Sequence, residues 1–253
     1  MSGGLEAERR SDLLIATINN PGCLNALSVD VLQGLERLVD ELEKTVDIRV
    51  VVLTASGSQA FCSGTDTEAS GGLGGIEFSR NRITSGHCLL DRLARVTVPV
   101  IAAINGDVMG GGLELVAACD MRISRPDAVF SLPETGTGVT PGWSGMQRVM
   151  RLMPEPVLRE MALTCQQMPA GRLHAVGFIN ELADDPCARA LEVAAGIEVL
   201  APRLVSVNKQ LLNAEAGEGH EAAIDWLAAG FVDKTSGKLQ GIRGKRPRKS
   251  GDA

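Results

Sequence analysis

Two nearly continuous apolar runs constrain the fold of this 253-residue chain more than any other feature. Residues 48–55 read IRVVVLTA, and residues 98–104 read VPVIAAI. A strand with one face in solvent alternates apolar and polar side chains, whereas neither run alternates, so both predict strands buried on both faces of a sheet. Sheets of that kind are mostly parallel, with helices covering each face. The runs therefore predict the α/β class.

Helical patterns separate and follow these runs. After Ser28, apolar residues recur at spacings of three and four, which predicts a helix with Ser28 as its N-cap. We expect a strand at residues 12–18, a helix at residues 86–95, and mostly helix from residue 156 onward, interrupted by a short strand at residues 177–182.

The chain length is close to the upper limit for one hydrophobic core. We expect residues 1–200 to form the α/β core and residues 201–253 to form a helical region with a basic tail. The tail holds six Lys or Arg residues between Lys238 and Lys249. Such a run is either a solvated terminus or a contact with an anionic ligand.

Three consecutive glycines, Gly110 to Gly112, lie between the strand at residues 98–104 and a following helix. Glycine allows a ligand to approach the main chain closely, and the N-terminus of a helix is electropositive, so these N–H groups can hold an oxyanion. A tight turn between strand and helix is the alternative. A second loop, AFCSGTD at residues 60–66, also follows a buried strand and could supply a second N–H group.

Two acids follow the glycines, Glu114 and Glu134. A pair of carboxylates beside an oxyanion site suits proton abstraction or water addition at the carbons α and β to a carbonyl. Taken singly, Glu114 also fits an acid in the first turn of a helix, and Glu134 also fits a solvated loop residue.

Composition argues against several classes of function. The net charge of −6 argues against a nucleic-acid binder. No apolar run approaches the roughly 18 residues of a membrane span, and residues 1–12 lack the apolar core of a signal peptide, so we expect a cytoplasmic protein without membrane contact. The six cysteines and three histidines lack metal-ligand spacing, so we expect reduced thiols and no metal site.

In their order along the chain, these segments resemble the crotonase (enoyl-CoA hydratase/isomerase) superfamily. The segments that resemble its signatures are INNPGCLNALS, IRVVVLTASGSQAFCSGTD, VPVIAAINGDVMGGGLELVAACDMRIS, FSLPETGTGVTPGWSGMQRVMRL and HAVGFINEL. The resemblance extends from about Ile18 to about Gly241. It implies a crotonase-like fold, a superhelix of ββα units, with a C-terminal helical region that takes part in oligomerisation.

The resemblance also implies an active site. The family holds the carbonyl oxygen of an acyl-CoA thioester between two backbone N–H groups, which correspond here to Thr65 and Gly111. Its hydratases place two glutamates beside the α and β carbons, and these correspond to Glu114 and Glu134. Further substrate contacts are implied for Ser63, Gly64, Asp66, Gly110 and Trp143, and a leucine contact is implied at position 25, which holds Asn25.

The activity implied is an enoyl-CoA hydratase of fatty acid metabolism, which adds water syn across a trans-2-enoyl-CoA. The substrate brings its own coenzyme A, so no other cofactor is expected, and the family resemblance implies a homotrimer or a dimer of trimers, a hexamer. The alternatives are an enoyl-CoA isomerase, an acyl-CoA decarboxylase or hydrolase of the same fold, and a non-catalytic acyl-CoA-binding paralogue.

Two positions depart from the family pattern. Cys23 replaces a common Lys or Arg that helps to hold the phosphates of coenzyme A, which weakens one contact or moves it elsewhere. Trp143 replaces a smaller residue, so its ring either reshapes the acyl pocket or packs between layers of the fold.

Overall fold

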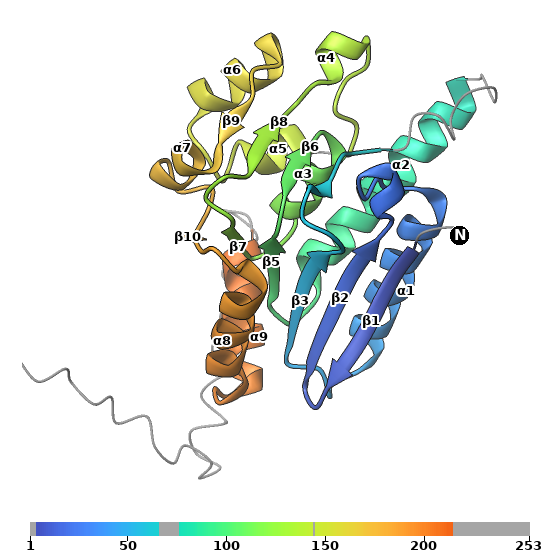
Figure 1. Ribbon diagram of the computed structural model, residues 1–253. Coiled ribbons are helices and arrows are strands. Elements are labelled where there is room, and N and C mark those ends of the chain that lie inside the picture. The colour runs from blue at the N-terminus through green and yellow to red at the C-terminus, as the bar shows by residue number, and fades with distance from the viewer. Residues whose placement is uncertain (1–3, 66–75, 144, 215–253) are drawn as a thin grey trace, which may run out of the picture. The chain divides into compact units, whose positions relative to one another are not determined.

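The computed structural model describes residues 4–65, 76–143 and 145–214 (Figure 1). The chain divides into two units, residues 1–200 and 201–253. In the second unit the described element is helix α9 (Pro202–Asn213). The predicted basic tail lies outside the described residues. No helix in the described ranges is long and apolar enough to cross a membrane.

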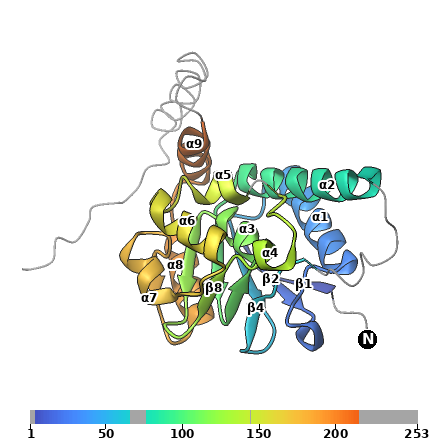
Figure 2. The same ribbon diagram turned by 90° about the horizontal axis from the view of Figure 1, so that it is seen from above.

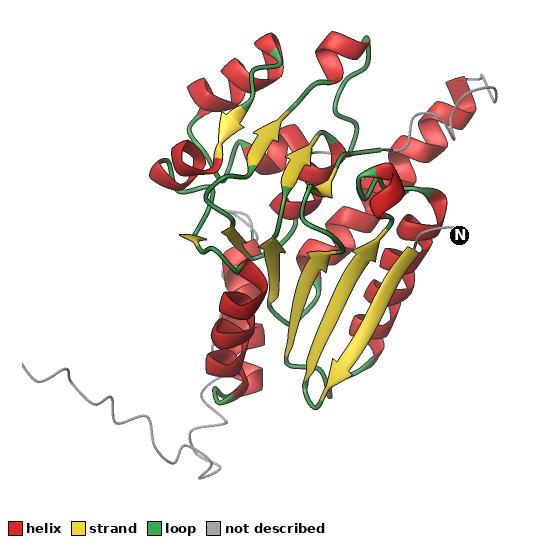
Figure 3. Cartoon of the chain, in the orientation of Figure 1, coloured by secondary structure: helices red, strands yellow, loops and turns green. Residues whose placement is uncertain are grey.

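A six-stranded sheet forms the centre of the first unit (Figure 3). The first pair of strands is antiparallel and all later neighbours are parallel. Its strands, in spatial order, are β1 (Gly4–Arg10), β2 (Leu13–Asn19), β3 (Val50–Ala55), β5 (Val100–Ile104), β7 (Met121–Ser124) and β10 (Glu181–Leu182). Every residue of β3 and β5 is buried, which confirms the prediction from the two apolar runs.

A second, four-stranded sheet continues the first. It consists of β4 (Ala60–Cys62), β6 (Asp107–Met109), β8 (Val129–Ser131) and β9 (Met168–Pro169). Strands β4, β6 and β8 are parallel to one another, and each follows a strand of the first sheet after a short loop: β3, β5 and β7. This repeated pairing of strands brings the loops after β4, β6 and β8 to one end of the second sheet.

Helices cover both faces of the six-stranded sheet (Figure 2). On one face, α1 (Val29–Lys44) and α2 (Ile76–Arg95) pack against residues such as Val51 and Leu53 of β3. On the other face, α8 (Pro186–Glu198) packs against alternate residues of the same strand, Val50 and Val52. The predicted N-cap is confirmed, because the side chain of Ser28 accepts a hydrogen bond from the N–H of Val31.

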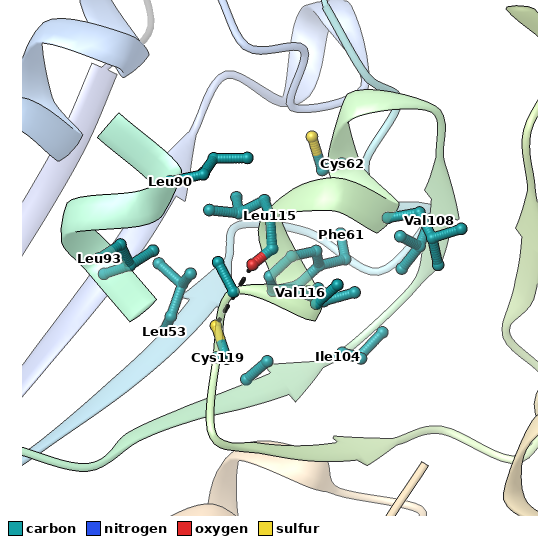
Figure 4. Close-up of a cluster of buried hydrophobic side chains, with 14 of the residues drawn as sticks. Leu53, Phe61, Cys62, Leu90, Leu93, Ile104, Val108, Leu115, Val116 and Cys119 are labelled. Atoms are coloured by element: carbon teal, nitrogen blue, oxygen red, sulfur yellow. Dashed lines mark hydrogen bonds between the residues drawn. The ribbon is translucent and has the colours of Figure 1, made fainter. Parts of the chain in front are cut away.

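The core extends from the sheet to helix α3 (Gly111–Ala117). Figure 4 shows Leu90 and Leu93 of α2 facing Leu115 of α3. All seven residues of α3 are buried, including its one charged residue, Glu114. Apolar packing on all sides therefore fixes the helix that carries two of the predicted site residues, Gly111 and Glu114.

The remaining helices lie between β8 and α8. They are α4 (Glu134–Thr137), α5 (Gly145–Val149), α6 (Glu155–Thr164) and α7 (Ala170–Ala175), and a 3-10 helix at Pro21–Cys23 follows β2. The strand predicted at residues 177–182 is shorter than expected: β10 is Glu181–Leu182, because the N–H groups of Gly177 and Phe178 close a turn onto helix α7. The N-terminal strand β1 was not predicted.

Candidate active site

Each of the three consecutive glycines has its own structural reason. Gly110 has a φ of +49°, a conformation that favours glycine, and a Cβ there would lie 2.5 Å from Oε1 of Glu134. A Cβ on Gly112 would lie 2.6 Å from the carbonyl oxygen of Cys62, so this glycine allows α3 to pack closely on β4. Gly111 is the first residue of α3, where an N–H group has no acceptor within the helix.

The loop after β4 lies directly against the start of α3. The carbonyl of Gly64 accepts a hydrogen bond of 2.8 Å from the N–H of Leu27, and Gly64 has a φ of +97°. A Cβ on Gly64 would lie 3.3 Å from the nitrogen of Gly111, and a Cβ on Gly111 would lie 3.0 Å from Oγ1 of Thr65. The structure thus brings together Thr65 and Gly111, the two residues predicted to donate N–H groups to one oxygen.

Glu114 is held in one orientation by main-chain donors. Its Oε1 accepts hydrogen bonds from the N–H groups of Trp143, at 2.9 Å, and Gly145, at 2.8 Å. Only 3% of the residue is exposed. Burial raises the pKa of Glu114, and the two N–H groups and the nearby charge of Arg148 oppose this shift only in part. A carboxyl group held in this way is placed to exchange protons with a bound substrate.

Glu134 begins α4, which follows β8, and reaches the same site from the other side. Its Oε1 lies against Gly110, while its Oε2 is buried without a hydrogen-bond partner among the described residues. Burial raises the pKa of Glu134, and the negative charge of Glu114 raises it further. The two predicted acids therefore share one site, and one oxygen of Glu134 remains available there.

The residues predicted to make further substrate contacts differ in their surroundings. Ser63, which precedes Gly64, donates a hydrogen bond of 3.3 Å from Oγ to the carbonyl oxygen of Cys23. Cys23 itself is exposed. Asp66 lies outside the described residues. Trp143 is buried, and its indole lies against Gly86 of α2 and near Gly111 of α3.

The leucine contact implied at position 25 is wrong, because Asn25 serves the protein's own loops. Its Nδ2 donates to the carbonyl oxygens of Ser56, at 2.9 Å, and Ala60, at 2.7 Å. Its Oδ1 accepts from the N–H of Asn20 at 2.9 Å, and the residue is 1% exposed. Asn25 has a φ of +55°, a conformation that asparagine adopts more readily than leucine.

The orientation of Glu114 by backbone donors could not be predicted from the sequence. Gly145 must be a glycine, because a Cβ there would overlap the side chain of Glu114. Arg148, three residues later in α5, pairs with Asp91 of α2 at 2.6 Å and so ties α5 to α2. Gly145, the second glycine in PGWSG, is the one sequence feature that could have indicated a close contact here. Nothing in its spacing relates it to Glu114. Among the described residues, no group of three or more His, Cys, Asp or Glu could hold a metal ion.

The model of the enoyl-CoA hydratase/isomerase family matches residues 8–238. A short-chain-enoyl-CoA hydratase of Clostridium acetobutylicum is 34% identical over 208 residues, which cover 81% of this chain and 79% of the relative. A crotonyl-CoA hydratase of Syntrophomonas wolfei is 30% identical over 221 residues, covering 86% of this chain and 83% of the relative.

Solved structures agree with this result. An enoyl-CoA hydratase from Bacillus anthracis superimposes with a TM-score of 0.85 at 26% identity, covering 93% of this chain and 92% of that chain. The DspI protein of Pseudomonas aeruginosa gives a TM-score of 0.84 at 28% identity, covering 92% and 89%. These similarities confirm the predicted crotonase-like α/β fold, and the chain belongs to the enoyl-CoA hydratase/isomerase family.

Proposed function

We propose that this protein is an enoyl-CoA hydratase that adds water syn across the double bond of a trans-2-enoyl-CoA. The observation that carries the proposal is that Glu114, which is buried, and Glu134, which is half-buried, share one site beside Thr65 and Gly111. The hydratases among its relatives support the same reaction.

In this mechanism the N–H groups of Thr65 and Gly111 hold the thioester oxygen. Negative charge develops on that oxygen when water attacks the β carbon, because the electrons of the double bond move toward the carbonyl. Backbone donors aimed at such an oxygen each contribute roughly 100- to 1,000-fold to the rate. The donor at Thr65 is its backbone N–H group, so this role does not depend on the side chain.

The two glutamates divide the proton transfers. Glu114, whose Oε1 is fixed by two N–H groups, activates the water that attacks the β carbon. Glu134, whose Oε2 has no partner among the described residues, helps to hold this water and delivers a proton to the α carbon, and the proton that Glu114 takes from the water replaces it. Burial raises the pKa of both groups, which makes each a better proton acceptor than an exposed carboxylate.

The wider setting of the reaction is also part of the proposal. The substrate carries coenzyme A, and the residues assigned to the reaction need neither a metal ion nor a nicotinamide. Family resemblance supports a role in fatty acid metabolism and assembly as a homotrimer or a dimer of trimers, and we place the enzyme in the cytoplasm.

The test is direct. Purified protein is mixed with crotonyl-CoA, and the absorbance of the conjugated thioester is followed while the product is identified as 3-hydroxybutanoyl-CoA by mass spectrometry. Loss of absorbance with formation of that product supports the proposal. Isomerisation of a 3-enoyl-CoA without hydration would make the protein an isomerase, and binding without turnover would make it an acyl-CoA-binding paralogue.

A further inference from the structure

The indole of Trp143 lies between two glycines that come from different helices. A Cβ on Gly86, within α2, would overlap Cε2 and Nε1 of the indole. A Cβ on Gly111, at the start of α3, would lie 3.3 Å from Cζ3. Trp143 is 4% exposed. The ring is therefore held by main chain at two edges.

Without the contact to Trp143, a glycine at position 86 would only reduce the stability of helix α2. A glycine in the interior of a helix costs about 1 kcal/mol relative to alanine. Gly86 is buried within the 20-residue helix α2, so the room it leaves is filled by the indole rather than by solvent. The absence of a side chain at Gly86 thus makes room for the large side chain of Trp143.

The same tryptophan lies beside two of the groups assigned to the substrate, Glu114 and Gly111. Its backbone N–H donates to Oε1 of Glu114, and its ring contacts Gly111, whose N–H is assigned to the thioester oxygen. A substrate held at Gly111 with its β carbon at Glu114 spans the same two residues. A chain that continues from the β carbon on the Trp143 side would therefore meet the indole.

We propose that Trp143, packed against Gly86, forms a wall of the acyl site and restricts the enzyme to enoyl-CoA thioesters with a short acyl chain. This inference rests on the proposed function. The side chain of Trp143 has two rotatable bonds, and its ring lies against the backbones of Gly86 and Gly111. It therefore cannot change rotamer without losing both contacts. Longer chains are excluded because the ring occupies the space that they need.

The first test compares chain lengths in Trp143→Ala. The values of kcat/KM are measured for trans-2-butenoyl-, trans-2-hexenoyl- and trans-2-decenoyl-CoA. In the unchanged protein we expect the C4 substrate to be strongly preferred, and in Trp143→Ala we expect the C10-to-C4 ratio to rise about tenfold or more, the scale on which a pocket discriminates methylene groups. Trp143→Phe should give a smaller rise. Leu163→Ala, which truncates a side chain that is 68% exposed on α6, is the control and should leave the ratio unchanged.

The second test uses the pairing with Gly86. In the unchanged protein, Gly86→Ala displaces the indole and should lower kcat/KM for the C4 substrate at least tenfold. In the Trp143→Ala background the added methyl group has room, so Gly86→Ala should change kcat/KM less than twofold. This coupling would be absent if Gly86 acted only on the helix. Equal effects in both backgrounds, or an unchanged C10-to-C4 ratio in folded Trp143→Ala, would overturn the inference.

Binding separates this inference from the proposed function. The Kd values of butanoyl-CoA and decanoyl-CoA, which cannot be hydrated, are measured by calorimetry for the unchanged protein and for Trp143→Ala. If Trp143→Ala strengthens the binding of decanoyl-CoA relative to butanoyl-CoA, Trp143 limits the chain length, even if no enoyl-CoA is hydrated. Hydration of crotonyl-CoA with no such shift supports the proposed function and overturns the wall.

Discussion

At the scale of single residues, the two glutamates differ in how tightly they are held. Glu114 accepts hydrogen bonds from two backbone N–H groups, whereas Oε2 of Glu134 is buried without a partner in the described ranges. The first carboxylate is fixed in position, and the second keeps an oxygen that can bind water or a substrate proton. This difference is the basis for assigning them different roles.

Replacement of either acid should remove most of the activity and leave the fold intact. Glu114→Gln and Glu134→Gln should each lower kcat by roughly 100- to 10,000-fold, because a positioned acid–base group contributes that much. Steady-state kinetics with crotonyl-CoA measures the loss, and circular dichroism checks the fold. A variant that keeps nearly the full rate would refute the role of that glutamate.

The buried charge of Glu114 also predicts a dependence of stability on pH. Its pKa in the folded protein is raised above the ordinary 4.5, so the unfolded chain gives up this proton first as the pH rises. Stability is therefore lost as the pH rises from 4.5 through the folded value. Glu114→Gln removes the buried charge and keeps an oxygen for both N–H donors.

Accordingly, Glu114→Gln should raise Tm at pH 7.5, and the gain should shrink toward zero at pH 4. Thermal unfolding at both pH values measures this difference. Glu36→Gln, which changes an exposed carboxylate on α1, is the matched control. A Tm for Glu114→Gln below that of the unchanged protein at pH 7.5 would contradict the account of burial.

At the scale of elements, α1 is a helix that local sequence patterns predict correctly. Its N-cap, Ser28, and its apolar stripe were both readable because each depends on near neighbours in the chain. Ser28→Ala should lower the free energy of unfolding by about 1 kcal/mol. Denaturant unfolding measures this loss, and kcat should not change, because α1 carries none of the assigned acids. An unchanged stability would show that the hydrogen bond to Val31 contributes nothing.

The contact between α3 and β4 supports a second prediction at this scale. Gly112→Ala places a methyl group against the carbonyl oxygen of Cys62, so it should cost about 1–3 kcal/mol of stability through overpacking. Gly171→Ala in α7 is the matched control, because a Cβ there meets nothing within 4 Å. Equal unfolding midpoints for the two variants would show that α3 does not need this close approach.

Other elements were not readable from local pattern. Strand β1 reads GLEAERR, and its burial is low because it is the edge strand of the sheet, paired on one side only. Strand β4 lies in a stretch of small and polar residues that reads as loop, and three buried residues give no usable period. Both strands are defined by their partners rather than by their own composition.

At the scale of the whole molecule, the site depends on the arrangement of two sheets. Glu114 and Glu134 lie twenty positions apart in the chain, on α3 and at the start of α4. Their meeting requires β6 and β8 to run side by side and in parallel. No spacing rule contains that information, so the residues alone indicate a possible pair of acids and the family resemblance is needed to assign them to one site.

The donors on Glu114 show the same limit. Gly145 and Trp143 lie about thirty residues after Glu114, and hydrogen bonds join them only because α5 packs on α3. Resemblance to the family named Trp143 as a substrate contact but gave no sign of its place between Gly86 and Gly111. Packing between distant helices has to be seen in the structure.

The most direct test of the central claim follows the atoms of water into the product. The protein is incubated with crotonyl-CoA in H₂¹⁸O and, separately, in D₂O, and the product is analysed by mass spectrometry and NMR. The account predicts 3-hydroxybutanoyl-CoA with one ¹⁸O at carbon 3 and one deuterium at carbon 2, added to the same face. In the time that the unchanged protein needs to complete the reaction, Glu114→Gln and Glu134→Gln should incorporate almost none of either label. Unlabelled crotonyl-CoA recovered intact, or labels added to opposite faces, would contradict it.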